Sequence, residues 1–293
     1  MSKTLELFGL LTTRDADWRF VVDKQQCPYL ERKCLKIRKS EPTVSIGSCT
    51  VRYGQHEQPI IICPYRLLER KQVFTDCLHL LTLHEPGNEF HVIPELSIPG
   101  GSIDYCLASV KGGKVKDFVG IELQTLDTTG TVWPERQRFL RDHHIPVLPE
   151  DVSSTKSFGM NWKMTSKTIL VQLHHKIETF EHINKHLVLA VQDRLIAYMR
   201  TEFSFGHLNT PARLGDPMHI HAYTVAESEA GLRLELSERT STDTAGIAAC
   251  LGLQVSPHMD LEVIVKLLES KLSPKTLLTF EGPMPSPEEL PEA

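Results

Sequence analysis

The chain has 293 residues and a net charge of −5, with 32 Lys and Arg against 37 Asp and Glu. Hydrophobic residues make up 41% and charged residues 24%, which is ordinary for a globular protein and excludes disorder over most of the chain. The charge excludes a uniformly basic DNA-coating protein, although a local basic face would still permit DNA binding. No apolar run approaches the roughly 18–20 residues that span a bilayer, and residues 1–18 lack the core of a secretory signal, so we expect a cytoplasmic protein without membrane contact.

Residues 1–20 predict a short strand or helix and then a polar turn. Residues 21–63 form a loop-rich segment that could not build a hydrophobic core unaided. Four of the seven cysteines fall in it, namely Cys27, Cys34, Cys49 and Cys63. An odd cysteine count without a signal peptide argues against a disulfide framework, so the cluster indicates a metal. Four thiolates in a tetrahedral set suit Zn²⁺ and iron equally, and buried free thiols are the alternative.

Residues 64–84 carry leucine and phenylalanine at helical spacing after Pro64, and they predict one amphipathic helix. Strand-like segments at 90–98, 102–110 and 115–126 follow, separated by glycine-containing turns, and predict a β-meander. We then expect a helix over 132–144, a buried strand at Thr168–Leu173, a polar helix over 176–186, and a buried strand at Leu187–Gln192 leading into Asp193–Arg200. This order predicts an α/β fold in which helices flank a mixed sheet.

The last third of the chain has weaker patterns. Strands are expected at His219–Ala226 and Leu232–Leu236, a helix at His258–Lys271, and a frayed, proline-rich acidic tail at the end. The adjacent residues His174 and His175 are expected to point apart and therefore not to share a metal.

Two carboxylates define the candidate catalytic site. Asp104 lies on the second strand of the meander, and Glu122 and Gln124 lie on the third, facing the same side. If the hairpin turns at Gly112-Gly113, the midpoint of 104 and 122 coincides with the turn, so Asp104 and Glu122 face each other across the ladder. Such a pair suits Mg²⁺ and indicates phosphodiester hydrolysis, whereas solvent-facing acids on an antiparallel sheet are the alternative.

These residues resemble the PD-(D/E)xK nuclease motif, here as Ser102-Ile103-Asp104 and Glu122-Leu123-Gln124, with Ile103 in place of Pro and Gln124 in place of Lys. The stretches SIPGGSIDY and GKVKDFVGIELQTLDTTGTVWPERQRF resemble the NotI-type restriction endonucleases more closely. CPYLERKC, SIGSC and IICPYRLLERKQVFTDC extend the resemblance into the N-terminal part. It covers most of residues 20–200, and nothing after position 200 is carried over from it.

The resemblance implies a type II site-specific deoxyribonuclease that hydrolyses double-stranded DNA with Mg²⁺ held by Asp104 and Glu122. It also implies a small fold with iron on the four cysteines before the nuclease core, a homodimer, and a cognate DNA methyltransferase in the host. We therefore divide the chain into a cysteine-bearing segment (1–63), a nuclease core (64–200), a C-terminal extension (201–280) and a tail (281–293). Gln124 would orient the attacking water by its amide.

Further residues are assigned roles around this site. The superfamily often adds another acid, and the candidates are Glu69, Glu85, Glu89 and Glu95. Glu95 is favoured because it lies beside Asp104 if the first hairpin turns at Pro99-Gly100. For DNA contact we expect the basic residues of the cysteine segment and of the helix after the meander, namely Arg32, Lys36, Arg38, Arg136 and Arg138.

Other functions remain open on the sequence alone. The chain could be a repair or mobile-element nuclease of looser specificity. It could also be a DNA-binding protein with an inactive nuclease core, because position 124 lacks the lysine. A redox sensor using the cysteine-bound metal is a further alternative.

Overall fold

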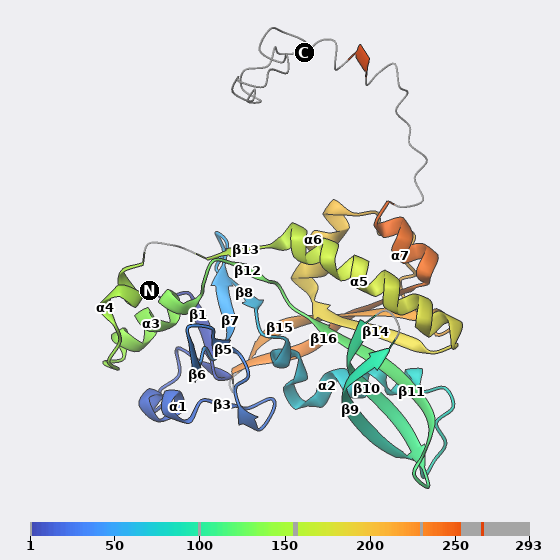
Figure 1. Cartoon of the computed structure of the whole chain (residues 1–293), viewed down its shortest axis with the longest axis horizontal. Coiled ribbons are helices and arrows are strands. Elements are labelled where there is room, and N and C mark those ends of the chain that lie inside the picture. The colour runs from blue at the N-terminus through green and yellow to red at the C-terminus, as the bar shows by residue number, and fades with distance from the viewer. Residues whose placement is uncertain (1, 99–100, 155–157, 229–230, 253–264, 267–293) are drawn as a thin grey trace, which may run out of the picture. The chain divides into compact units, whose positions relative to one another are not determined.

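A six-stranded mixed sheet is the centre of the fold in the computed structural model, which describes residues 2–98, 101–154, 158–228, 231–252 and 265–266 (Figure 1). Only the parallel pairs β11–β14 and β14–β15 interrupt its antiparallel pattern. The α/β class with a mixed sheet is confirmed. In spatial order the strands are β16 (Gly231–Thr242), β15 (Met218–Ser228), β14 (His186–Gln192), β11 (Lys114–Gln124), β10 (Gly101–Lys111) and β9 (Glu89–Ile98).

The predicted meander is confirmed as β9, β10 and β11. Gly112 and Gly113 have φ values of 58° and 71°, which is the left-handed geometry of a two-residue type I′ hairpin. Tyr105 pairs with Ile121, so the register has the expected midpoint. The other predicted turn, Pro99-Gly100, lies outside the described residues, and Ile98 pairs with Gly101 across it.

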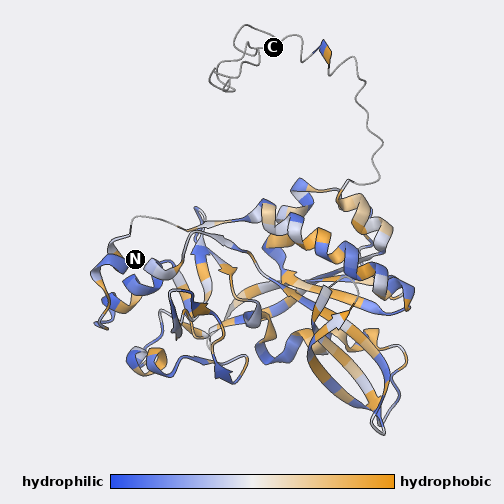
Figure 2. Ribbon diagram, viewed as in Figure 1, coloured by the Kyte–Doolittle hydropathy of each residue, from blue (hydrophilic) through white to orange (hydrophobic). Residues whose placement is uncertain are grey.

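Strand β14 is buried along most of its length, as its continuous apolar run predicts, and it leads into α6 (Asp193–Glu202). Together with α5 (Trp162–His182) and α7 (Thr244–Cys250), α6 packs its apolar side chains against one face of the sheet (Figure 1). In Figure 2, β14 has a mainly hydrophobic colour.

The strand predicted at Thr168–Leu173 is wrong, because these residues lie within α5, which also takes in most of the polar helix predicted after it. Ile169, Leu170 and Leu173 are buried while Val171 is 47% exposed, so the burial has helical spacing. A short apolar run does not distinguish a buried strand from a helix segment. Here the run belongs to a helix, because α5 is far longer than an ordinary strand.

The single helix predicted over 64–84 is also wrong. The segment forms a 3₁₀ helix (Pro64–Lys71), then α2 (Gln72–Cys77), then another 3₁₀ turn (Leu78–Leu80). The helical geometry is interrupted at Glu69, with ψ of 126°, and at Arg70, with φ of 53°. The apolar side chains nevertheless cover the second face of the sheet, as the helical pattern predicts.

A buried ion-pair network explains this break. Arg66 is fully buried and contacts Glu6 at 2.8 Å and Glu69 at 2.9 Å. Its Nη2 donates to the carbonyl oxygen of Leu232 on β16, and Glu69 accepts a hydrogen bond from the backbone N–H of Leu234. A straight helix would move Glu69 away from these partners, and a buried guanidinium without them would be costly.

The N-terminal part is built around a second, four-stranded sheet of order β2-β1-β7-β8. A core of Leu7, Phe8, Trp18 and Phe139 joins this part to α3, and the helix predicted over 132–144 is confirmed by α3. The elements are β1 (Thr4–Leu7), β2 (Leu10–Leu11), α1 (Trp18–Lys24), β3 (Gln26–Cys27), β4 (Arg32–Lys33), β5 (Ile37–Arg38), β6 (Glu41–Ser45), β7 (Ser48–Tyr53), β8 (Gln58–Ile61), β12 (Thr128–Thr129), α3 (Trp133–Asp142), α4 (Pro149–Ser153) and β13 (Gly159–Met160).

The strands predicted after position 200 are confirmed and are longer than expected. β15 pairs with β14 and with β16, so both strands belong to the same sheet as the meander. The helix predicted at His258–Lys271, apart from Val265 and Lys266, and the predicted tail lie outside the described residues. Within the described part of the chain, no helix is long and apolar enough to cross a membrane.

Candidate active site and cysteine cluster

Asp104 and Glu122 meet on the paired strands β10 and β11. The neighbouring pair Tyr105–Ile121 sets the register, and the Asp104 carboxylate accepts a hydrogen bond of 2.8 Å from the backbone N–H of Leu123. Both side chains are half-buried. The expected proximity of the two acids is therefore confirmed, while their catalytic role stays a prediction.

A lysine from helix α5 completes this group. The Nζ of Lys176 lies 2.7 Å from Oε1 of Glu122, and the two side chains are 10% and 13% exposed. The site thus contains a cation, although Gln124 stands where the motif has lysine. Sequence reasoning missed Lys176 because this part of the chain was expected to begin a separate helix after a strand. The available signal was that this cationic residue shares the buried face of a helical pattern with Ile169, Leu173 and Ile177.

The carboxylates are held in an unfavourable environment for negative charge. Burial raises the pKa of Glu122 to about 7, and the charge of Asp104 adds to this, against the opposing effect of Lys176. Burial likewise raises the pKa of Asp104, although its hydrogen bond from Leu123 and the charge of Lys176 act the other way. A divalent cation would relieve the repulsion, and oxygen ligands of this kind suit Mg²⁺.

Glu95 lies on β9, next to Asp104 in the register, since Leu96 pairs with Ile103 and Pro94 with Tyr105. Its charge contributes to the raised pKa of Asp104, so the two acids are near each other as expected. The other three candidates lie elsewhere: Glu69 is in the buried network, Glu85 pairs with Lys111, and Glu89 lies near His91.

Gln124 faces a hollow of about 740 Å³ between the end of β11 and the cysteine segment. Its amide donates to the carbonyl oxygen of Thr125 at 3.2 Å. The hollow is also lined by Lys36 and Lys39, so two basic side chains lie beside the candidate site.

The four cysteines predicted to bind a metal are all buried, at 4–6% exposure, and are free thiols. Backbone N–H groups point at their sulfurs: those of Tyr29 and Leu30 at Cys27, and that of Tyr65 at Cys63. The amide of Gly9 does the same at Cys49. Hydrogen bonds from backbone amides favour thiolates, so this donor set fits a thiolate-bound metal.

The sulfurs of the cluster also act on one another's pKa values, although burial by itself favours their neutral thiols. Burial raises the pKa of Cys63 to about 11, and the charges of Cys34 and Cys27 raise it further. Burial and the charge of Cys63 raise the pKa of Cys49. Within the described residues, no three of the cysteine sulfurs lie mutually within 4.8 Å, so metal ligation would draw them closer together.

The cysteine cluster and the carboxylates are neighbours. Tyr65 lies two residues after Cys63, and its pKa is raised by burial and by the charges of Cys63, Glu95 and Asp104. Arg32 acts on the same tyrosine in the opposite direction. The segment that carries the cysteines is therefore positioned beside the candidate active site.

The basic residues predicted to contact DNA fall into two groups. Arg32 is exposed near Tyr65, and Lys36 donates to the carbonyl oxygen of Ile62 at the edge of the hollow. The side chains of Arg38, Arg136 and Arg138 are instead engaged within the protein. Arg38 pairs with Glu41 and Asp151, Arg136 is only 3% exposed, and Arg138 pairs with Glu135 and donates to the carbonyl oxygens of Val152 and Ser154.

One further ligand group differs from expectation. On α5, ligand atoms of His174, His175 and Glu178 lie within 4.8 Å of one another, so the expectation that the two histidines point apart is wrong. Their rings are 5.8 Å apart. The group is largely exposed.

Comparison with known proteins leaves the identification to the site itself. No family model matches the chain, and no curated protein is significantly similar to it.

Proposed function

We propose that the protein is a type II-like restriction endonuclease that hydrolyses phosphodiester bonds of double-stranded DNA with Mg²⁺, and that the mixed sheet is a PD-(D/E)xK nuclease core. The observation that carries this proposal is the half-buried pair Asp104 and Glu122 with the amine of Lys176 at 2.7 Å from Glu122. Two acids and a cation, with Gln124 two residues after Glu122 on the same strand, are suited to a scissile phosphate.

In this proposal Asp104 and Glu122 hold the Mg²⁺, which would polarise the phosphate and lower the pKa of a water. Lys176 opposes the rise in the pKa of Glu122 and supplies the positive charge that Gln124 cannot. Gln124 orients the attacking water by its amide. Glu95, next to Asp104, takes part through water or as an additional metal ligand.

The cysteine cluster is proposed to hold one iron or zinc ion with a structural role. It would order a loop-rich segment that otherwise has little core of its own, and it would fix Tyr65 and Arg32 beside the carboxylates. The resemblance of the cysteine stretches to the NotI-type enzymes favours iron, and no separate observation favours zinc.

A homodimer is supported by the edge strand β9. Phe90, Val92, Ile93 and Leu96 are 40–48% exposed on this strand, which has a free edge in the sheet. Exposed apolar edge strands are normally covered, and a second copy would cover this one while bringing two sites to the two DNA strands. A cognate DNA methyltransferase would protect host DNA.

The proposal is tested by incubating the protein with unmodified phage DNA and Mg²⁺ beside Asp104→Asn, and sequencing the ends. Discrete fragments from the wild type alone are expected. Exposed Asp142→Asn, on the surface of α3, is the matched control and should cut as the wild type does. DNA binding without cutting by the wild type, over several unrelated DNAs, would favour the alternative of an inactive DNA-binding protein. Cutting at many unrelated sequences would favour a repair nuclease.

A further inference from the structure

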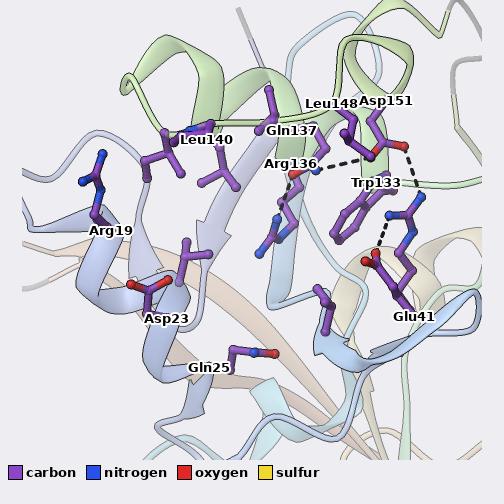
Figure 3. Close-up of a pocket in the computed structure, with 16 residues that line it drawn as sticks. Arg19, Asp23, Gln25, Glu41, Trp133, Arg136, Gln137, Leu140, Leu148 and Asp151 are labelled. Carbon is purple, nitrogen blue, oxygen red and sulfur yellow. Dashed lines mark hydrogen bonds and ion pairs between the residues drawn. The ribbon is translucent and has the colours of Figure 1, made fainter.

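A second hollow, of about 720 Å³, lies between helix α1, strand β6 and helices α3 and α4 (Figure 3). Its walls include apolar side chains such as Val44, Leu140 and Leu148, together with the indole of Trp133. This volume and mixed lining are typical of sites for small organic ligands.

Arg136, one of the arginines that line this hollow, has no carboxylate partner. Arg136 is 3% exposed, and its hydrogen bonds go to neutral oxygens, from Nε to the carbonyl of Ile46 at 2.9 Å and from Nη1 to the amide of Gln137 at 2.8 Å. Among the residues that the structure describes, no carboxylate lies within 4.0 Å of it and no acceptor contacts Nη2. A buried, unpaired charge is expensive, so the Nη1–Nη2 edge is prepared for an anion.

A neighbouring guanidinium further raises the cost of the buried charge on Arg136. Arg38 and Arg136 lie 4.3 Å and 4.7 Å from the ring centroid of the same indole, that of Trp133. Burial and the charge of Arg38 lower the pKa of Arg136 to about 10, against the opposing effect of Cys34. Two acids of the hollow, Glu41 and Asp151, accept from Arg38, as the dashed lines of Figure 3 show. The third, Asp23, makes no ion pair with Arg136 among the described residues.

The hollow at Arg136 shares lining residues with two others that lie toward Gln124. The hollow at Gln124 shares Lys36 and Lys39 with a middle one of about 820 Å³. The middle hollow shares Arg38 and Trp133 with the one that contains Arg136. The three hollows therefore lie in a row between Gln124 and Arg136, called the groove below, and exposed Lys39 is one of the basic residues that line it.

We propose that the hollow at Trp133 binds the phosphoryl group of a nucleotide, with the Nη1–Nη2 edge of Arg136 as its principal ligand and the apolar wall around Leu140 against the nucleotide's body. The nucleotide belongs either to a DNA strand in the groove or to a free mononucleotide. The first case rests on the proposed nuclease function, and the second is independent of it.

Three proteins separate these cases from a purely structural arginine. Arg136→Gln removes the cation. Val44→Phe fills the hollow and leaves the cation in place, so it keeps the test valid if the first variant fails to fold. Arg141→Gln is the matched control, because its guanidinium is exposed on the same helix, pairs with Asp142 and does not line the hollow.

Binding of inorganic phosphate and of the four deoxynucleoside monophosphates is measured by calorimetry, and binding of a duplex oligonucleotide by anisotropy with Ca²⁺ in place of Mg²⁺. A free nucleotide as ligand predicts monophosphate binding by the wild type and the control, weakened about 10- to 100-fold in both hollow variants. DNA as ligand predicts little monophosphate binding, and a salt dependence of duplex binding whose slope falls by about 0.9 in Arg136→Gln.

The proposal is overturned if the wild type binds no monophosphate and its duplex affinity and salt slope match those of both hollow variants. Failure of the nuclease proposal is distinguishable, because it appears as absent cleavage by the wild type in Mg²⁺, whatever the monophosphates do.

Discussion

Replacing Lys176 by methionine should raise the pH at which the protein becomes active. Met keeps the length and apolar stem of the side chain but removes the amine that lies 2.7 Å from Glu122. Without it, only a backbone hydrogen bond from Asp104 still opposes the effects of burial and of the Asp104 charge on the pKa of Glu122. Glu122 will then take up a proton at higher pH, and a protonated carboxyl is a poor ligand for Mg²⁺.

The magnitude follows from the geometry. In the wild type the pKa of Glu122 lies at about 7, above its ordinary value of 4.5. Protonation of Glu122 therefore stabilises the folded state by about 3 kcal/mol. This contribution is complete below pH 4.5 and is lost as the pH rises through 7. Loss of a cation in contact raises a carboxyl pKa by about 1–3 units, so Lys176→Met should lose a further 1–4 kcal/mol, approximately, at pH 9.

Two measurements check this. The rate of DNA cleavage between pH 6 and 9 should show an acid limb displaced upward by about 1–3 units in Lys176→Met. Urea unfolding over the same range gives the free energy without requiring activity. Lys167→Met, exposed on the same helix, should behave as the wild type in both assays. An unchanged pH profile together with unchanged pH dependence of unfolding in Lys176→Met would refute the coupling of this amine to Glu122.

Three other changes have expected outcomes. Cys27→Ser should abolish the bound iron or zinc measured by elemental analysis, whereas Cys250→Ser, also buried but outside the cluster, should retain it. Gly120→Ala should lower the free energy of unfolding, measured by urea denaturation, by about 1–3 kcal/mol, because a Cβ there would lie 2.5 Å from Cζ of Phe180. Gly206→Ala is the control and should change this free energy by less than about 0.5 kcal/mol, because a Cβ there would meet nothing within 4 Å. Val92→Glu on β9 should convert a dimer to a monomer in sedimentation, and Val171→Glu on α5 should not; a monomeric wild type would contradict the role of β9.

The meander was accessible from sequence because its determinants are local. Gly112 and Gly113 fix a two-residue turn, which sets the register to within the one-residue bulge after Ser109 and so brings Asp104 and Glu122 into the same neighbourhood. The burial of β14 was accessible for a similar reason, since strand-sized apolar runs are typical of parallel central strands.

The remaining features depend on contacts between distant segments. Lys176 reaches Glu122 from 54 positions along the chain, and no local pattern connects the two. The helix breaks after Leu68 because Arg66 and Glu69 bind Glu6 and Leu234, which lie far away in sequence. The hydrophobic spacing of this segment correctly indicates which side chains are buried, but it does not contain the reason for the break.

The position of Arg66 has a consequence for how the molecule could be divided. Glu6 and Leu232, which both bind its guanidinium, lie near opposite ends of the described chain, and the arginine itself follows Cys63 by three residues. Cutting the chain after position 63 would leave a fully buried cation without Glu6, at a cost of about 3–5 kcal/mol. The cysteine-bearing part is thus not a cassette that can be exchanged between proteins. It is expected to unfold together with the sheet.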